Sequence, residues 1–201
     1  MLTGAQDGGL ELRRERGGSV RLAGRFPYNK RAVLSDGGRT GRPRKEVIAP
    51  RAFAYRVDRP DEDIHFLVGH SYDRPLASRR AGTLLIFDSE DALTFEAILS
   101  AEMQRVSYVA DFLAGFAAGL VMGLSPGFRI PPPRTVPDAE TVEDEDPEEG
   151  TAIIRTVNQA LLYEISAVTR PAYDEAQIEE RNWTSEVGRP ALVNHLNRWR
   201  P

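Results

Sequence analysis

Cysteine is absent from the 201 residues of this chain. This absence excludes disulfides, thiolate zinc sites, iron–sulfur clusters and a cysteine nucleophile. The fold must then rest on a hydrophobic core, and 41% of the residues are hydrophobic, as in an ordinary globular protein. We expect one domain with appendages in a reducing compartment.

Long hydrophobic segments are also missing. The longest apolar run, residues 112–124, is shorter than the roughly 18 to 20 residues that cross a bilayer, so we interpret it as a buried helix. The N-terminus has no apolar segment typical of a secretory signal. These features predict a cytoplasmic protein that makes no membrane contact.

Histidine is scarce, with only His65, His70 and His195. His65 and His70 are five residues apart on a predicted strand, which sends their side chains to opposite faces. Because there is also no HExxH motif, a metal site is disfavoured and no cofactor is expected.

Lysine occurs only twice, and charge is unevenly distributed. Residues 1–59 contain 14 Lys+Arg and 6 Asp+Glu, whereas residues 60–201 contain 12 and 24. A basic N-terminal region can bind nucleic acid or an acidic partner. No recognition motif accompanies the basic residues, so nucleic acid is disfavoured as a partner.

Composition divides the chain into three parts. Residues 1–19 are expected to be a flexible basic arm, residues 20–175 the domain, and residues 176–201 a C-terminal tail. Within the domain we predict a disordered acidic loop at 134–150, because residues 136–150 contain eight acidic residues and no basic one.

Hydrophobic periodicity predicts a mainly β protein with packed helices, of the α+β class. Strands are expected at 20–24, 45–48, 63–69, in a hairpin of 82–87 and 92–99, and in two strands between 152 and 169; helical segments are expected at 51–57 and 101–121. Gly115, Gly119 and Gly123 recur every four residues, which would place them on one helix face where another backbone packs closely.

Ser125 is the first candidate nucleophile, because residues 123–127 match G-x-S-x-G. In an α/β-hydrolase esterase this pattern needs a strand before the serine and a helix after it. Here a helical segment precedes Ser125, and Pro126 has no N–H for an oxyanion hole. An esterase is therefore a minor alternative.

His70 is a better partner for Ser125, since neutral imidazole is the usual base for a serine hydroxyl near pH 7. It follows an apolar strand and precedes a polar turn at 71–75, where a functional side chain can be presented. Spacing alone favours the alternative, a lone histidine that caps a strand.

Four blocks in sequence order carry a family resemblance. They are GRFPYN with VIAPRAF (24–29, 47–53), LVGH with PLA (67–70, 75–77), GLVMGLSPGF (119–128) and LYEISAVTRPA (162–172). Together they cover most of residues 24–175. They resemble the prohead (capsid maturation) proteases of HK97-type tailed phages and phage-like gene transfer agents, although Arg51 stands where that family often has glycine.

The resemblance implies a mixed β-barrel similar to the herpesvirus maturation protease. It also implies a serine endopeptidase with Ser125 as nucleophile and His70 as general base. Because Pro126 cannot donate, candidates for the oxyanion hole are the Gly127 N–H and the charges of Arg129 and Arg170.

Glu164 is our candidate for the third catalytic residue, which would orient His70. It alternates with Leu162 and Ser166 along an apolar strand, where an unpaired carboxylate is costly. The alternative is a structural salt bridge from Glu164 to Arg170 or Arg129.

The implied substrate is the scaffolding region of the major capsid protein, cleaved inside an assembling procapsid, and the chain itself. A homodimer is expected only by analogy with the herpesvirus enzyme. The alternative from another class is a catalytically inactive scaffolding or assembly protein of the same fold.

Overall fold

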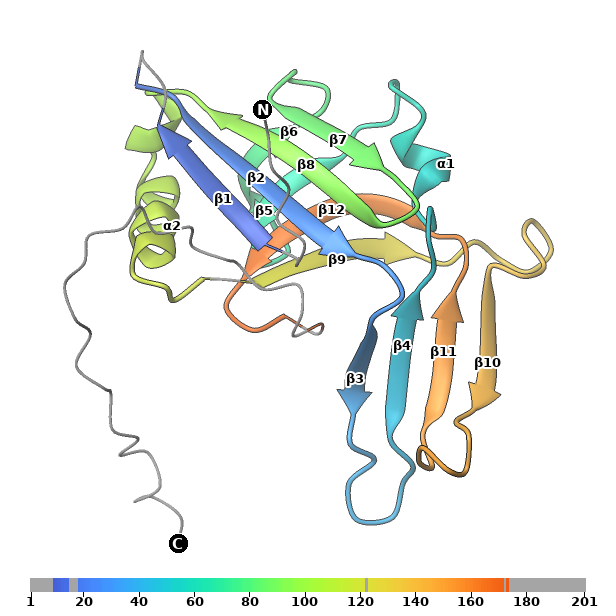
Figure 1. Cartoon of the computed structure of the whole chain (residues 1–201). Helices are drawn as coiled ribbons and strands as arrows, with labels where there is room; N and C mark the ends of the chain where they lie inside the picture. The colour runs from blue at the N-terminus through green and yellow to red at the C-terminus, as the bar shows by residue number, and fades with distance from the viewer. Residues whose placement is uncertain (1–8, 15–17, 122, 172, 174–201) are drawn as a thin grey trace, which may run out of the picture.

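The described residues form three four-stranded sheets (Figure 1). The structure is a computed structural model that describes residues 9–14, 18–121, 123–171 and 173. The first sheet is antiparallel and has the order β1-β2-β8-β7, with β1 (Gly9–Arg14), β2 (Val20–Pro27), β8 (Ala92–Leu99) and β7 (Leu84–Asp88).

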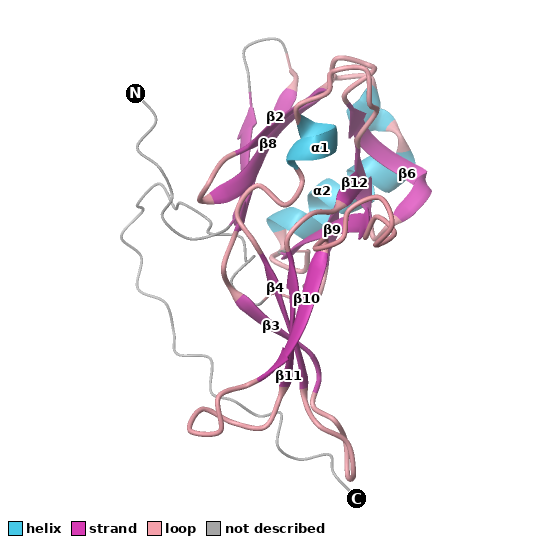
Figure 2. Ribbon diagram, turned by 90° about the vertical axis from the view of Figure 1, so that its right-hand side faces the viewer, coloured by secondary structure: helices cyan, strands magenta, loops and turns pink. Residues whose placement is uncertain are grey.

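A second sheet extends away from the rest of the protein (Figures 1 and 2). Its order is β10-β11-β4-β3, with β10 (Glu140–Asp144), β11 (Ile153–Val157), β4 (Arg44–Ile48) and β3 (Arg31–Ser35). We call these four strands the projecting sheet. Strands β11 and β4 are parallel, and the two outer pairs are antiparallel.

The third sheet carries the blocks singled out in the sequence. Its order is β6-β5-β12-β9, with β6 (Ser71–Ser78), β5 (His65–Val68), β12 (Leu161–Val168) and β9 (Gly123–Arg129). The central strands β5 and β12 are parallel, and β9 is antiparallel to β12. This sheet therefore brings together segments that lie almost 100 residues apart.

The core lies between the first and third sheets. Phe66 of β5 packs on Phe95 of β8 with ring centroids 4.8 Å apart. Gly24 of β2 admits this packing, because a Cβ at that position would lie 2.3 Å from the Phe95 ring. The short helix α1 (Ala54–Val57), the 3-10 helix η1 (Met103–Arg105) and helix α2 (Ser107–Ala117) complete the described elements. Helix α2 buries Val109 and Phe112 against this core.

These elements confirm a mainly β fold with packed helices, but the expected barrel is wrong for the described chain. Each sheet ends in two edge strands, and none closes on itself. The projecting sheet shows why no barrel closes. Its edge strands β3 and β10 pair with no strand of the other two sheets, from which this sheet extends away (Figure 2). Neither α2 nor α1 is long and apolar enough to cross a membrane, and no other described helix is.

Two segments that we expected to lack structure form strands. Residues 9–14 of the expected basic arm are β1, which buries Leu10. Residues 140–144 of the expected acidic loop are β10, paired with β11. The expected C-terminal tail, residues 176–201, lies outside the described residues.

Ion pairs explain why the acidic segment is ordered. The buried carboxylate of Glu145 contacts the Lys45 ammonium and accepts a hydrogen bond from the Ala152 N–H at 3.0 Å. Arg42 pairs with Asp144 at 2.8 Å, and Arg31 with Glu149 at 2.7 Å. The basic and acidic halves of the sequence therefore meet in the projecting sheet, which composition alone does not reveal.

Of the three glycines expected on one helix face, only Gly115 lies in the helix. Helix α2 ends at Ala117, and Gly119 follows it with a positive φ of 70°. Gly123 belongs to β9, where a Cβ would lie 2.5 Å from Pro171. The four-residue spacing therefore reflects a helix end followed by a close contact in a strand.

We predict that Glu145→Gln lowers the melting temperature at pH 7 by a few degrees. The hydrogen bond from Lys45, followed by that from the Ala152 N–H, lowers the pKa of Glu145. A carboxylate with a lowered pKa stabilises the fold above its unfolded pKa of about 4.3, and this stabilisation is lost as the pH falls through the folded value. Melting curves of variant and wild type should converge in acid. The exposed Glu143→Gln is the control, and an equal effect of both substitutions would contradict this role.

Arg51 has a positive φ of 56°, the conformation that favours glycine. Its guanidinium compensates by donating to the Asp88 carbonyl at 2.7 Å and to Asp58 at 2.5 Å. These side-chain contacts therefore help to hold Arg51 in its left-handed conformation.

We predict that Arg51→Gly is more stable than Arg51→Ala by about 1 kcal/mol, because alanine keeps the left-handed strain and loses the same contacts. Urea unfolding of both variants measures the difference. The usual order, with alanine more stable than glycine, would show that this backbone is not strained.

Candidate active site

A two-residue turn positions His70. Val68 of β5 pairs with Ser71 of β6, so only Gly69 and His70 connect the two strands. Both have φ of 61°, as a type I′ hairpin turn requires. The strand expected at 63–69 is observed as the shorter β5, whereas the turn expected at 71–75 is wrong, because the turn comes earlier and β6 starts at Ser71.

Two hydrogen bonds attach this turn to the central strand β12. The Gly69 N–H donates to the Ala167 carbonyl at 3.0 Å, and the His70 N–H donates to Ser166 Oγ at 2.9 Å. The His70 side chain is 46% exposed. The imidazole is thus held at β12 and remains accessible from solvent.

A bulge in β12 turns Glu164 away from the core. Phe128 of β9 pairs with Leu162, the next residue Gly127 pairs with Glu164, and the register shifts between them. Because adjacent residues of a strand face opposite sides, Leu162 and Glu164 also face opposite sides. Our expectation that Glu164 shares a face with Leu162 is therefore wrong, and Leu162 lies in the core.

Both oxygens of the buried Glu164 carboxylate are hydrogen-bonded. Oε1 lies 2.6 Å from His70 Nδ1, and Oε2 accepts a bond from the Ser166 hydroxyl at 2.6 Å. Glu164 is 4% exposed and Ser166 is fully buried. The alternative salt bridge is not observed, since no ion pair among the described residues joins Glu164 to Arg129 or Arg170.

Ser125 lies on the same face of the sheet. It pairs directly with Ser166 across β9 and β12, and directly paired residues point to the same side. Ser125 is half-buried, in the third position of β9. The nucleophile elbow of an esterase is absent here, because Ser125 lies within a strand and helix α2 precedes it.

Gly127 provides the space for the Glu164 carboxylate. A Cβ at Gly127 would lie 1.9 Å from Glu164 Oε1, the oxygen that contacts His70. The sequence indicated a role only for the Gly127 N–H, and this steric role was not predicted. The available signal was a glycine two positions after Ser125 in a strand, where glycine often marks a close approach.

His65 also lies on this face, contrary to the expectation from its spacing. It pairs with Glu164 across β5 and β12. Its ring contacts Tyr72, with centroids 5.6 Å apart, and Nε2 lies 3.5 Å from the Asp63 carboxylate. The spacing argument failed because His70 belongs to a turn and not to the strand.

The two candidate arginines flank Ser125 at a distance. Arg129 is four positions along β9, or about 13 Å between Cα atoms in an extended strand, and Arg170 follows the end of β12. The Arg129 guanidinium lies over the Tyr163 ring, 5.5 Å from its centroid. Both arginine side chains are exposed.

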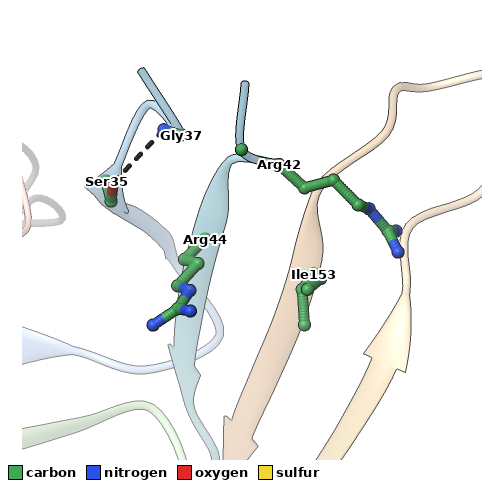
Figure 3. A pocket seen from close by; sticks show the side chains of 6 residues that line it. Ser35, Gly37, Arg42, Arg44 and Ile153 are labelled. Carbon is green, nitrogen blue, oxygen red and sulfur yellow. Dashed lines mark hydrogen bonds between the residues drawn. The ribbon is translucent and has the colours of Figure 1, made fainter. Parts of the chain in front are cut away.

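A hollow of about 290 Å³ lies at the end of the projecting sheet, and none of its lining residues belongs to the site at β9 and β12 (Figure 3). Its lining residues are Ser35, Gly37, Gly41, Arg42, Arg44 and Ile153. The Arg42 guanidinium donates hydrogen bonds to the Thr151 and Ala152 carbonyls, so these N–H groups are not available to a ligand in the hollow. The lining contains no acid or base that could assist Ser35, so the site at β9 and β12 is the better candidate.

Comparison with protein families matches residues 34–189 to the family described as caudovirus prohead serine protease. The matched range includes Ser125, His70 and Glu164. The description names caudoviruses and gives no support to a gene transfer agent. Searches of curated proteins and of solved structures give no match.

We predict that Gly127→Ala reduces proteolytic activity by about 100-fold, because the new methyl group displaces the Glu164 carboxylate from His70. The comparison variant is Gly115→Ala in α2, where a Cβ meets only Val121 at 3.4 Å. Activity and melting temperature are measured together. Full activity in a folded Gly127→Ala protein would refute the steric role.

Proposed function

Because the chain belongs to the caudovirus prohead serine protease family, we propose that Ser125, His70 and Glu164 form its catalytic triad. The observation that carries this proposal is the 2.6 Å contact between His70 Nδ1 and Glu164 Oε1, on the sheet face that bears Ser125. The family makes the protein a serine protease of capsid maturation, whereas the residue roles are our inference.

In this proposal each nitrogen of the imidazole has its own role. Nδ1 donates its hydrogen to Glu164, which leaves Nε2 as the basic nitrogen. Nε2 takes the proton from Ser125 Oγ as that oxygen bonds to the scissile carbonyl carbon. The proton then passes to the leaving amine as the peptide C–N bond breaks, and water hydrolyses the acyl-enzyme through the same base.

Glu164 acts through His70. The Ser166 hydroxyl holds one carboxylate oxygen, and this bond aligns the other oxygen with Nδ1. Ser166 Oγ also accepts a hydrogen bond from the His70 N–H, so one buried hydroxyl positions both Glu164 and His70. A carboxylate at this distance stabilises the imidazolium that forms when Ser125 loses its proton.

For the oxyanion we favour the Gly127 N–H over the charges of Arg129 and Arg170. Arg170 lies four positions beyond Ser166, the residue that pairs with Ser125. Arg129 is about 13 Å along the strand from Ser125. Its guanidinium also lies on Tyr163. These two features suit a residue that binds substrate away from the scissile bond.

We propose that the substrates are the scaffolding region of the major capsid protein and the protease itself. The accessible His70 suits a polypeptide substrate. Self-cleavage is favoured because a protease confined in a procapsid meets its own chain ends at high effective concentration. A homodimer stays a prediction.

We predict that Ser125→Ala and His70→Ala each abolish processing, and that the double variant is no worse than either single one, because nucleophile and base act as a unit. Glu164→Gln should slow processing by at least about 100-fold without unfolding the protein. The measurement is the intact mass of the capsid protein and of this chain after co-expression with the neighbouring capsid gene.

Ser107→Ala, at the exposed start of α2, is the matched serine control and should process normally. Normal capsid processing by Ser125→Ala would refute the nucleophile assignment. Capsid cleavage without any shortening of this chain would refute self-cleavage alone.

A further inference from the structure

Arg129 lies on the catalytic face of the third sheet. It is the last residue of β9, and Ser125, Gly127 and Arg129 alternate along one side of that strand. The bulge lies in β12, so it does not disturb this alternation in β9. A polypeptide that binds over Ser125 along β9 therefore also passes Arg129.

The guanidinium of Arg129 is exposed and held in place. It lies over the Tyr163 ring, on which Arg56 also packs with its guanidinium 4.3 Å from the ring centroid. Arg56 is engaged by its hydrogen bonds to Glu62 at 2.6 Å and to the Asp63 carbonyl at 3.1 Å. Among the ion pairs of the described residues, none involves Arg129.

Tyr72 of β6 lies on the same face of the third sheet as Glu164. The Tyr72 side chain on β6 is exposed. Its pKa is raised by partial burial and then by the charge of Glu164, while Arg56 and Arg129 act in the opposite direction. Tyr72 also contacts the ring of His65, which pairs with Glu164, so Tyr72 lies beside the Glu164–His70 pair.

We propose that Arg129, supported by the Tyr163 ring, is a specificity residue that binds an Asp or Glu side chain of the substrate. This inference rests on the proposed function of Ser125. A guanidinium binds a carboxylate through two parallel hydrogen bonds. An extended substrate advances about 3.3 Å per residue, so the acidic residue lies about three or four positions from the scissile bond.

The test is a cleavage profile on a peptide library, read by mass spectrometry. Wild-type protein should enrich Asp and Glu at one position about three or four residues from the cleaved bond. Arg129→Gln should lose this enrichment, and for a matched peptide pair with Glu or Gln at that position its kcat/KM for the Glu peptide should fall by about 10- to 100-fold. Its kcat/KM for the Gln peptide should stay near the wild-type value.

Charge reversal makes the assignment specific. Arg129→Glu should prefer a Lys peptide over the Glu peptide at the same position. Arg105→Gln, an exposed arginine of η1, is the control and should keep the wild-type profile.

Ser125-dependent cleavage without acidic enrichment, or enrichment that persists in Arg129→Gln, would overturn this inference and leave the proposed function intact. Cleavage that persists in Ser125→Ala would instead overturn the proposed function.

Discussion

The hydrogen bond between His70 and Glu164 is the contact on which the arrangement of the site depends. A carboxylate that is 4% exposed must be fully hydrogen-bonded to be tolerated, and this one is bonded by the imidazole and by Ser166. Three local features make the contact possible. The β12 bulge turns Glu164 out of the core, Gly127 leaves room for its oxygen, and the left-handed turn brings His70 back to β12.

The parallel pairing of β5 and β12 brings these features together. It places the turn after β5 beside Ser166, so that the buried hydroxyl bonds both the turn and the carboxylate. The antiparallel neighbour β9 then sets Ser125 directly opposite Ser166. Ser125, His70 and Glu164, the proposed nucleophile, base and acid, come from two strands and a turn far apart in sequence, and one sheet fixes them on one face.

The sequence was informative where local chemistry decides the outcome. Alternating hydrophobicity correctly predicted the β7–β8 hairpin, and the residue types correctly predicted that Glu164 needs a partner. Predictions from the sequence failed where contacts with a distant segment determine the local structure. The β12 bulge depends on its register with β9, and β10 depends on basic residues about 100 positions earlier, such as Lys45. The positive φ of His70 was missed because Gly69-His70 lacks the Asn-Gly, Asp-Gly or Gly-Gly signature of a two-residue hairpin turn.

The partner of the second Glu164 oxygen determines how much negative charge faces His70 and whether the Arg129 guanidinium is left available. With Arg129 as partner, the carboxylate would already be neutralised and would stabilise an imidazolium less. Ser166 satisfies one oxygen without adding charge, so the full negative charge of Glu164 faces Nδ1. The same arrangement leaves Arg129 on Tyr163, exposed on the side that a substrate would occupy. With the neutral Ser166 hydroxyl as partner, Glu164 remains directed at His70, and the Arg129 guanidinium remains available for the substrate contact that we propose.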